Sequence, residues 1–500
     1  MRYVLTGEEA KEIDWYTIQQ VGIPAVVLME RAALAVAQAV MREEERTEKI
    51  VIAAGCGNNG ADALAAARIL WQQGWRNLKV LQVGEDSHGT VEWQMQKHIL
   101  EQMGIRIEKF EQGCVPNAGA AVDGIFGIGL SRPVEGIFAD CIQECNANVR
   151  HIYAVDISSG IHADTGKILG VCIKAYRTIA FGSEKLGSIL YPGTEYSGMV
   201  ETVDIGFPEC AAAAVNPKAV RFEPGDLRRL PVRPAYSNKG TFGRVLIAAG
   251  GKNMAGAAYL SAYAAYSVGA GLVRILTVEE NRTILQTLLP EAILTIWDET
   301  NLETQVEQCM EWATVAAVGP GLGTGDGAGR LLHTMLRHRR CPLVLDADAL
   351  NLLAENPGWQ TLLGENCILT PHLGELSRLT NISVERLQEN LLAEVDILGS
   401  KWHATVVCKD ARTIVCTGGE PLYVNVSGNQ AMAKGGSGDV LTGIIVGLVA
   451  QKRSCHEAAC LGVYLHGLAG DAVQAEKGSY SLLATDLVRA LFGLLVQHPE

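Results

Sequence analysis

Residues 435–439 combine groups that can bind an anion with a group that can move a proton. They read Gly-Gly-Ser-Gly-Asp and lead directly into an apolar stretch, 440–450, with helical character. Consecutive glycines let backbone N–H groups crowd against a ligand, and a helix start adds unpaired donors and a positive dipole end. A simple helix cap needs only one Gly or Ser. The run therefore predicts an anion pocket in which the Asp439 carboxylate is a base.

A second glycine run, residues 55–60, reads Gly-Cys-Gly-Asn-Asn-Gly between a strand-like and a helical stretch. It matches the G-x-G-x-x-G pattern of dinucleotide sites, in which the helix start faces a pyrophosphate. That pattern also needs an acid at the end of the next strand to hold a ribose, but Gln82 and Val83 stand there. A dehydrogenase is therefore the disfavoured alternative for the first half.

Asp123 and Asp156 each follow a strand-like apolar run. Because the carboxyl ends of parallel strands meet at one edge of a sheet, we expect both residues to lie near residues 55–60. Carboxylate, hydroxyl and Asn amide oxygens suit a small hard cation better than His or Cys would. These residues predict a ligand and cation site at that edge.

The elements that must position these groups alternate along the chain. Strand-like runs at 49–54 and 78–83 are each followed by a helical run, and the second half repeats the style. This alternation predicts α/β domains with parallel sheets wrapped by helices. The periodic pattern dissolves between residues 206 and 245, which indicates a junction. We expect domains at 1–212 and 231–500 with a linker at 213–230.

Composition narrows the class of protein. A chain of 500 residues with 48% hydrophobic and 19% charged residues is ordinary for a globular enzyme. A net charge of −13 leaves no broad basic face, which argues against a nucleic-acid partner. Thirteen cysteines without a CxxC pair are typical of reduced thiols in the cytoplasm. No apolar leader or long apolar run occurs, so we expect neither secretion nor a membrane span.

Four motifs of the first half resemble the NAD(P)H-hydrate epimerases over roughly residues 1–210. They read Gly-Asn-Asn-Gly-Ala-Asp at 57–62, Asp-Gly-Ile-Phe-Gly-Ile-Gly-Leu at 123–130, Asp-Ile-Ser-Ser-Gly at 156–160 and Tyr-Pro-Gly at 191–193. The family usually has glycine where this chain has Ala61 and Ala63. Two added methyl groups would narrow a close backbone approach to a ligand, so a regulatory nucleotide-binding module is the alternative for this half.

The resemblance implies a Rossmann-like three-layer domain in which Asp156 is catalytic and K⁺ is bound by Asn59, Asp123 and Ser159. The implied substrates are NADHX and NADPHX, the hydrates of NADH and NADPH, whose R and S forms would interconvert by opening at C6. The implied substrate-binding residues are Asn58, Asn59, Gly60, Ala61, Asp62, Gly127, Ile128, Gly129, Leu130, Ser131, Arg132, Pro133 and Asp156.

Motifs of the second half resemble the ADP-dependent NAD(P)H-hydrate dehydratases of the ribokinase-like superfamily, over about 225–500. They include Gly-Pro-Gly-Leu-Gly at 319–323, Pro-His-Leu-Gly-Glu at 371–375, Lys-Asp-Ala-Arg-Thr at 409–413 and the run 435–439. The resemblance implies a ribokinase-like three-layer α/β domain that uses ADP with Mg²⁺. The implied substrate-binding residues are Ala257, Gly323, His372 and Asp439, and the implied adenylate-binding residues are Lys409, Asp410, Ala411, Arg412, Thr413 and Gly438.

The two resemblances together imply a bifunctional repair enzyme of hydrated nicotinamide nucleotides, and we expect a homo-oligomer. In the hypothesised dehydration, Asp439 takes the proton of the C6 hydroxyl as that oxygen attacks the β-phosphate of ADP. Phosphate then leaves, giving NAD(P)H, AMP and phosphate. The helix dipole at residue 439 predicts a lowered Asp439 pKa. A ribokinase-type small-molecule kinase, which would use the same loop, is the alternative for this half.

Overall fold

The computed structural model describes residues 1–496, and they form two compact units. One unit comprises Arg2–Ala219, and the other comprises Met1 together with the chain from Val220 onward. The division falls inside the expected linker, 213–230. That segment is not patternless, because it contains the end of helix α7 (Glu209–Val215) and the short strand β9 (Ala219–Arg221).

The first unit is built on a seven-stranded parallel sheet with the order β4-β3-β2-β5-β6-β7-β8. Its order reverses between β2 and β5, and a doubly wound sheet opens a crevice at the carboxyl ends of the two strands at such a point. The strands are β2 (Ile50–Ala54), β3 (Leu78–Gln82), β4 (Ile107–Lys109), β5 (Ala118–Gly124), β6 (Val149–Val155), β7 (Arg177–Phe181) and β8 (Met199–Val203).

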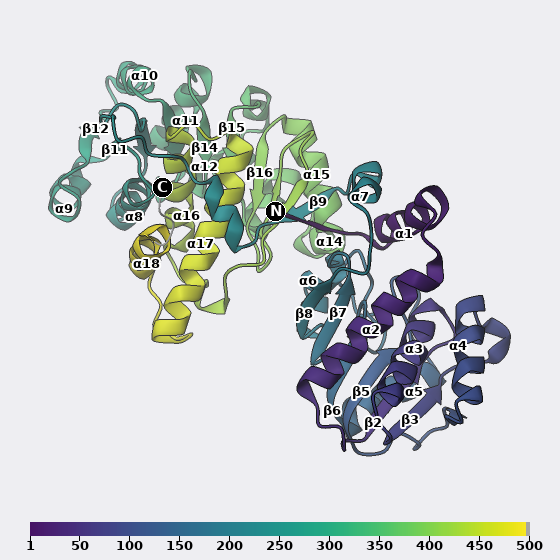
Figure 1. Cartoon of the computed structure of the whole chain (residues 1–500). Helices are drawn as coiled ribbons and strands as arrows, with labels where there is room; N and C mark the ends of the chain where they lie inside the picture. Colours follow the sequence, from purple (N-terminus) through teal and green to yellow (C-terminus); the bar gives the residue numbers. More distant parts are fainter. Residues whose placement is uncertain (497–500) are drawn as a thin grey trace. The chain divides into compact units, whose positions relative to one another are not determined.

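Helices cover both faces of this sheet (Figure 1). α2 (Ala25–Glu43), α3 (Asn58–Gln72) and α4 (Val91–Gln102) share one core with alternate strand residues such as Ile50 and Ile52. α5 (Ile137–Asn148) packs on the other face against Val51 and Ala53. Successive strand residues point to opposite faces, so both faces are apolar and the expected three-layer fold is confirmed. The unit also contains α1 (Gly7–Tyr16) and α6 (Leu186–Ile189).

The sheet of the second unit runs β18-β17-β16-β15-β14-β13-β10-β11-β12. The strands from β16 to β12 are parallel, whereas β17 and β18 are antiparallel, and the order reverses between β10 and β13. The strands are β10 (Arg244–Ala248), β11 (Leu272–Thr277), β12 (Ile293–Ile296), β13 (Val315–Val318), β14 (Leu343–Leu345), β15 (Cys367–Leu369), β16 (Thr405–Cys408), β17 (Ile414–Cys416) and β18 (Leu422–Val424).

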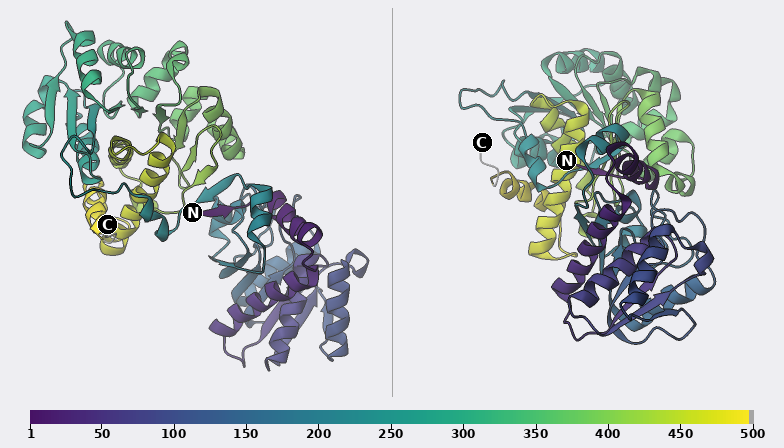
Figure 2. Two further views of the ribbon diagram at one scale, coloured as in Figure 1. Left: turned by 45° about the horizontal axis from the view of Figure 1, so that its top comes forward. Right: turned by 45° about the vertical axis from the view of Figure 1, so that its right-hand side comes forward.

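Two groups of helices enclose this second sheet, again in three layers (Figure 2). One face carries α8 (Ala255–Ser267), α9 (Arg282–Leu288), α16 (Ser437–Ala450), α17 (Cys455–Lys477) and α18 (Ala484–Val496). The other carries α10 (Leu302–Trp312), α11 (Asp326–Arg337), α12 (Asp348–Glu355), α13 (Leu373–Thr380), α14 (Val384–Glu389) and α15 (Leu391–Trp402).

Helix α16 packs unusually close to α8, and this contact places the loop 435–439. A Cβ atom at Gly443 would lie 2.7 Å from the Cβ of Ala264, so only glycine fits there. The hydroxyl of Ser261 on α8 donates to the backbone carbonyl of Asp439 at 3.0 Å.

Neither α16 nor any other helix within residues 1–496 is long and apolar enough to cross a membrane.

Candidate active sites

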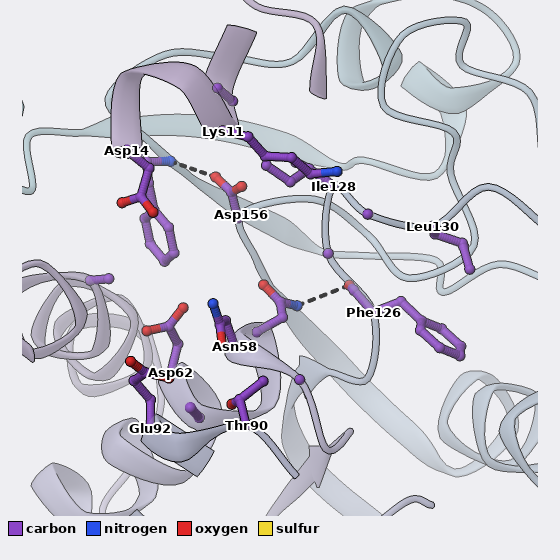
Figure 3. A pocket seen from close by; sticks show the side chains of 18 of the residues that line it. Lys11, Asp14, Asn58, Asp62, Thr90, Glu92, Phe126, Ile128, Leu130 and Asp156 are labelled. Atoms are coloured by element: carbon purple, nitrogen blue, oxygen red, sulfur yellow. Dashed lines mark hydrogen bonds between the residues drawn. The ribbon is translucent and has the colours of Figure 1, made fainter. Parts of the chain in front are cut away.

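A cavity of about 830 Å³ lies in the first unit at the carboxyl ends of β2 and β5. This volume is in the range of small-molecule sites. Its walls come from the first turn of α3, the loop after β5, the end of β6, and helices α1 and α4 (Figure 3). The expected substrate residues that line it are Asn58, Asn59, Ala61, Asp62, Gly127, Ile128, Gly129, Leu130, Ser131, Arg132 and Asp156.

Gly60 and Pro133 are not among the lining residues of the cavity. Gly60 packs directly against the backbone of Gly55, and a Cβ atom there would overlap the Gly55 carbonyl. The turn between β2 and α3 therefore requires glycine at position 60. Helix α3 begins at Asn58, inside the glycine run 55–60, so both Asn side chains belong to its first turn.

Asn59 and Ser159 meet at the backbone of Phe126, and Asp123 binds Ser159. The Asn59 amide donates to the Phe126 carbonyl at 2.9 Å, and the Phe126 N–H donates to the Ser159 hydroxyl at 2.8 Å. The Asp123 carboxylate, 1% exposed, accepts from the Ser159 hydroxyl at 2.6 Å and from the Ser159 N–H at 2.9 Å. Burial raises the pKa of Asp123 to about 6.

The oxygens of this cluster are a carboxylate, a hydroxyl, an amide and a carbonyl, which is a donor set suited to a hard cation. Within residues 1–496, no three His, Cys, Asp or Glu side chains gather as a metal site. The three expected K⁺ ligands thus fit an alkali cation by both their convergence and their chemistry.

Asp156 is held by a buried lysine that the sequence pattern did not single out. Lys185, 2% exposed, forms an ion pair with Asp156 and also donates to the carbonyl of Ser183 at 3.2 Å. The N–H of Phe181 donates to the same oxygen, Asp156 Oδ1, at 2.9 Å. Asp156 has a φ of 66°, a strained conformation for a non-glycine residue that persists only where the surroundings impose it.

Four more carboxyl groups border the cavity, those of Asp14, Asp62, Glu85 and Glu92, and two of them come from helices that carry no motif. Figure 3 shows Asp14 of α1, Asp62 of α3 and Glu92 of α4 around the same space as Asp156. Burial, followed by the charges of Asp156, Asp14 and Glu92, raises the pKa of Asp62 well above its usual value. Burial and the charges of Asp156 and Glu92 also raise the pKa of Asp14.

The two alanines that depart from the family pattern lie in different places. Ala61 lines the cavity, but Ala63 is fully buried in the core shared by α3 and the sheet. A Cβ atom at Gly124 would lie 2.5 Å from the Cβ of Ala63, so the Ala63 methyl group faces β5. Of the two methyl groups, only that of Ala61 borders the space available to a ligand.

In the second unit, the loop 435–439 leads into α16, which begins at Ser437. Asp439 therefore lies in the first helical turn. Its pKa is not lowered, as the helix dipole predicted, but raised to about 7. Burial is the main cause; the Asp346 charge adds to it, and the Lys409 charge opposes it. Partial burial beside a second carboxylate raises the pKa of Asp439, which makes it a better base near neutral pH.

Asp346 is the buried centre of this site, only 1% exposed. Its Oδ1 accepts from Lys409 Nζ and from the Thr370 hydroxyl, both at 2.7 Å, and its Oδ2 accepts from the Thr442 hydroxyl at 2.7 Å. These bonds connect the ends of β14, β15 and β16 to helix α16. Although burial opposes its charge, the Asp346 and Glu375 carboxylates raise the pKa of Lys409.

The expected adenylate residues divide between this centre and an open turn. Lys409 lies beside the glycine loop, since a Cβ atom at Gly438 would be 3.5 Å from Lys409 Nζ. Residues 410–413 form the turn between β16 and β17, in which the Thr413 hydroxyl donates to the Asp410 carbonyl at 3.2 Å. Asp410 and Ala411 are exposed, and Arg412 and Thr413 are half-buried.

The expected substrate residues of the second unit occupy neighbouring strand ends. His372 caps α13: its Nδ1 accepts from the N–H of Gly374 at 3.0 Å, and its ring is half exposed. The N–H of Gly323 donates to Asp348 at 2.7 Å, and Ala257 is buried in the first turn of α8. A residue missed by sequence reasoning, His466 of α17, lies 3.2 Å from the Ser437 hydroxyl. Burial lowers the His466 pKa to about 4.

These features define a two-unit α/β protein with one candidate ligand site at the carboxyl edge of each sheet. A family model described as NAD(P)H-hydrate dehydratase matches residues 245–492, and one described as YjeF-related protein N-terminus matches residues 25–187. The second unit is ribokinase-like: a ribokinase-like superfamily protein from Enterococcus faecalis is 30% identical with a TM-score of 0.51, covering 56% of this chain and 96% of its own.

Two full-length relatives carry the same name. The bifunctional NAD(P)H-hydrate repair enzyme Nnr of Moorella thermoacetica is 35% identical, over 97% of this chain and 95% of the relative. The enzyme of that name from Escherichia coli K12 is 33% identical, over 94% of this chain and 89% of the relative. The chain belongs to the family of bifunctional NAD(P)H-hydrate repair enzymes.

Proposed function

We propose that the first unit interconverts the R and S hydrates NADHX and NADPHX, and that the second unit dehydrates the S hydrate at the expense of ADP. The observation that carries the dehydration is Asp439, a base with a pKa of about 7 inside a glycine loop and beside the Lys409 ammonium. Family membership supports both activities.

In the dehydration, Asp439 removes the proton of the C6 hydroxyl while that oxygen bonds to the β-phosphorus of ADP and the bond to the α-phosphate breaks. Lys409, the glycine N–H groups and Mg²⁺ carried with ADP would offset the phosphate charge. AMP leaves first. The C6–O bond then breaks as the ring nitrogen donates its electron pair, and loss of the C5 proton gives NAD(P)H and phosphate. This path leaves no stable phosphorylated metabolite, which a kinase would release.

In the first unit, Asn59, Asp123 and Ser159 would hold K⁺. The ion would supply positive charge that fixes the loops after β5 and β6 around the substrate. Support for the site comes from the contacts of Asn59 and Ser159 with the Phe126 backbone and from the contact of Asp123 with Ser159. Asp156, at the end of β6, would act at the C6 hydroxyl.

A single assay tests both activities. A mixture of R and S hydrates is incubated with ADP, Mg²⁺ and the whole chain, in K⁺ or in tetramethylammonium, and the absorbance of reduced nicotinamide is followed. In K⁺, we expect complete conversion of the hydrates. In tetramethylammonium, we expect the reaction to stop near the S fraction and slow spontaneous conversion to follow. A stop at the S fraction in both salts would make the first unit a regulatory module, and equal rates in both would refute the K⁺ site.

We also propose a cytoplasmic homo-oligomer. The described cysteines are all free thiols, as expected in a reducing compartment. The α18 region exposes large apolar side chains, namely Tyr480, Leu483, Phe492 and Val496, and such groups favour contacts with another chain. Sedimentation of the whole chain should give a mass above 53.6 kDa, and a monomer would contradict this assembly.

A further inference from the structure

Epimerisation in the first unit needs a proton donor as well as the base Asp156. When the ring opens, a base takes the C6 hydroxyl proton, the C6–O bond becomes a carbonyl, and the C6–N1 bond breaks with its electrons on N1. N1 must then receive a proton. Rotation about the C5–C6 bond presents the other carbonyl face, and closure returns both protons to their donors. No net proton, electron or atom is consumed.

The environment of Asp156 suits it to the role of base. Lys185 and the Phe181 N–H both bind its Oδ1, so Oδ1 is fixed. Its Oδ2 has no hydrogen bond to any residue that the structure describes, and Asp156 lines the cavity. The ammonium of Lys185 is itself anchored by the carbonyls of Phe181 and Ser183 at 3.3 and 3.2 Å. Lys185 is therefore a fixed partner of Asp156 Oδ1.

Asp62 has the opposite environment within the same cavity. Its side chain has no hydrogen bond or ion pair with any residue in the described part of the chain, and its charged neighbours include the carboxyls of Asp156, Asp14 and Glu92. Burial and these like charges raise the pKa of Asp62 well above its usual value. Two carboxyl groups in one cavity with contrasting environments, one ion-paired and one without a partner in the described part of the chain, are the pattern of an acid and base pair.

We propose that Asp62 is the proton donor of the epimerisation and Asp156 the base, and that Lys185 and Asp14 are positioning residues, Lys185 by fixing Asp156 Oδ1 and Asp14 by its charge near Asp62. This assignment rests on the proposed function of the first unit. Asp62 protonates N1 as the ring opens and takes the proton back as it closes. Lys185 stabilises the charged Asp156, and Asp14 disfavours a charge on Asp62.

Other charged side chains also line the cavity. They are Lys11 of α1, Glu85 and His88 before α4, Glu92 of α4, and Arg132 of the loop after β5. The interconversion rate should fall at high pH as Asp62 loses its proton. Replacing Asp14 by Asn removes a neighbouring negative charge, lowers the pKa of Asp62 and should move this fall to lower pH.

The test follows conversion of purified S hydrate to R hydrate by chromatography, with the whole chain and no ADP. Asp62→Asn should lower the rate by about 100- to 10,000-fold, the usual contribution of general acid catalysis, and abolish the fall at high pH. Lys185→Met should lower kcat more than it changes KM, and Lys185→Arg should recover part of the loss. Dehydration of S hydrate with ADP by the same Asp62→Asn sample should match wild type, which controls for concentration and for folding of the second unit.

Three results separate the possible failures. If Asp62→Asn keeps the wild-type rate within about threefold, or keeps the fall at high pH at a reduced rate, Asp62 is not the donor. If Asp14→Asn leaves the pH at which the rate falls unchanged, Asp14 does not act on Asp62. This variant tests the role of Asp14 even if Asp62→Asn misfolds. If wild type gives no more R hydrate than buffer does, the proposed function of the first unit is wrong.

Discussion

Asp439→Asn should lower turnover of the S hydrate with ADP by about 100- to 10,000-fold, because it removes the base and leaves the loop backbone in place. The rate is measured from the absorbance of reduced nicotinamide with saturating ADP. Asp348→Asn is the matched control. It removes a charge that also acts on Asp439, but its amide oxygen can still accept from the Gly323 N–H, so the rate should stay within a few-fold of wild type. Equal losses in both variants would refute the base assignment.

The pH profile of wild type gives an independent check on Asp439. A base must be ionised to act, and the pKa of Asp439 is raised to about 7 by burial and by Asp346. The dehydration rate should therefore be constant at alkaline pH and fall as the pH drops through about 7. A profile that stays flat down to the ordinary range of an aspartate would contradict the raised pKa.

Asp346→Asn should be the most destabilising of these substitutions. The carboxylate is buried, and Lys409, Thr370 and Thr442 all donate to it. Loss of its charge leaves the Lys409 ammonium without its closest partner, and breaking a buried pair costs about 3–5 kcal/mol. The cost is measured as the free energy of local opening in the second unit, from hydrogen exchange of β14 and β15 amides in increasing urea.

Thr370→Val is the matched control for Asp346→Asn. It removes one neutral donor from the same carboxylate and should cost about 1 kcal/mol. If the two variants open with similar free energies, the Lys409 pair adds little to stability. In any folded Asp346→Asn protein, the dehydration rate should also begin to fall at a lower pH than in wild type. The charge of Asp346 raises the Asp439 pKa, and its removal lowers that pKa.

Much of the fold and of both sites follows from the sequence alone. Apolar runs predicted strands closely: the runs at 49–54 and 78–83 correspond to β2 (Ile50–Ala54) and β3 (Leu78–Gln82). Glycine runs and acidic residues at strand ends predicted where the ligand edges lie, because parallel strands bring their carboxyl ends together. The turn at 55–60 and the loop at 435–439 both lead into helices at those edges.

Tertiary packing decided what those residues can do. The sequence around Asp439 shows only a helix start, which lowers the pKa of a carboxyl group. In the folded protein, burial and the charge of Asp346, at the end of β14, raise the pKa of Asp439. Lys185 and Asp14 carry no motif, yet folding brings both to the cavity of Asp156. Desolvation and charge act through space and depend on what packs around a group. The sequence by itself therefore determined where the two ligand edges lie, and only the folded structure decided which groups surround the carboxyl groups at those edges and shift their pKa values.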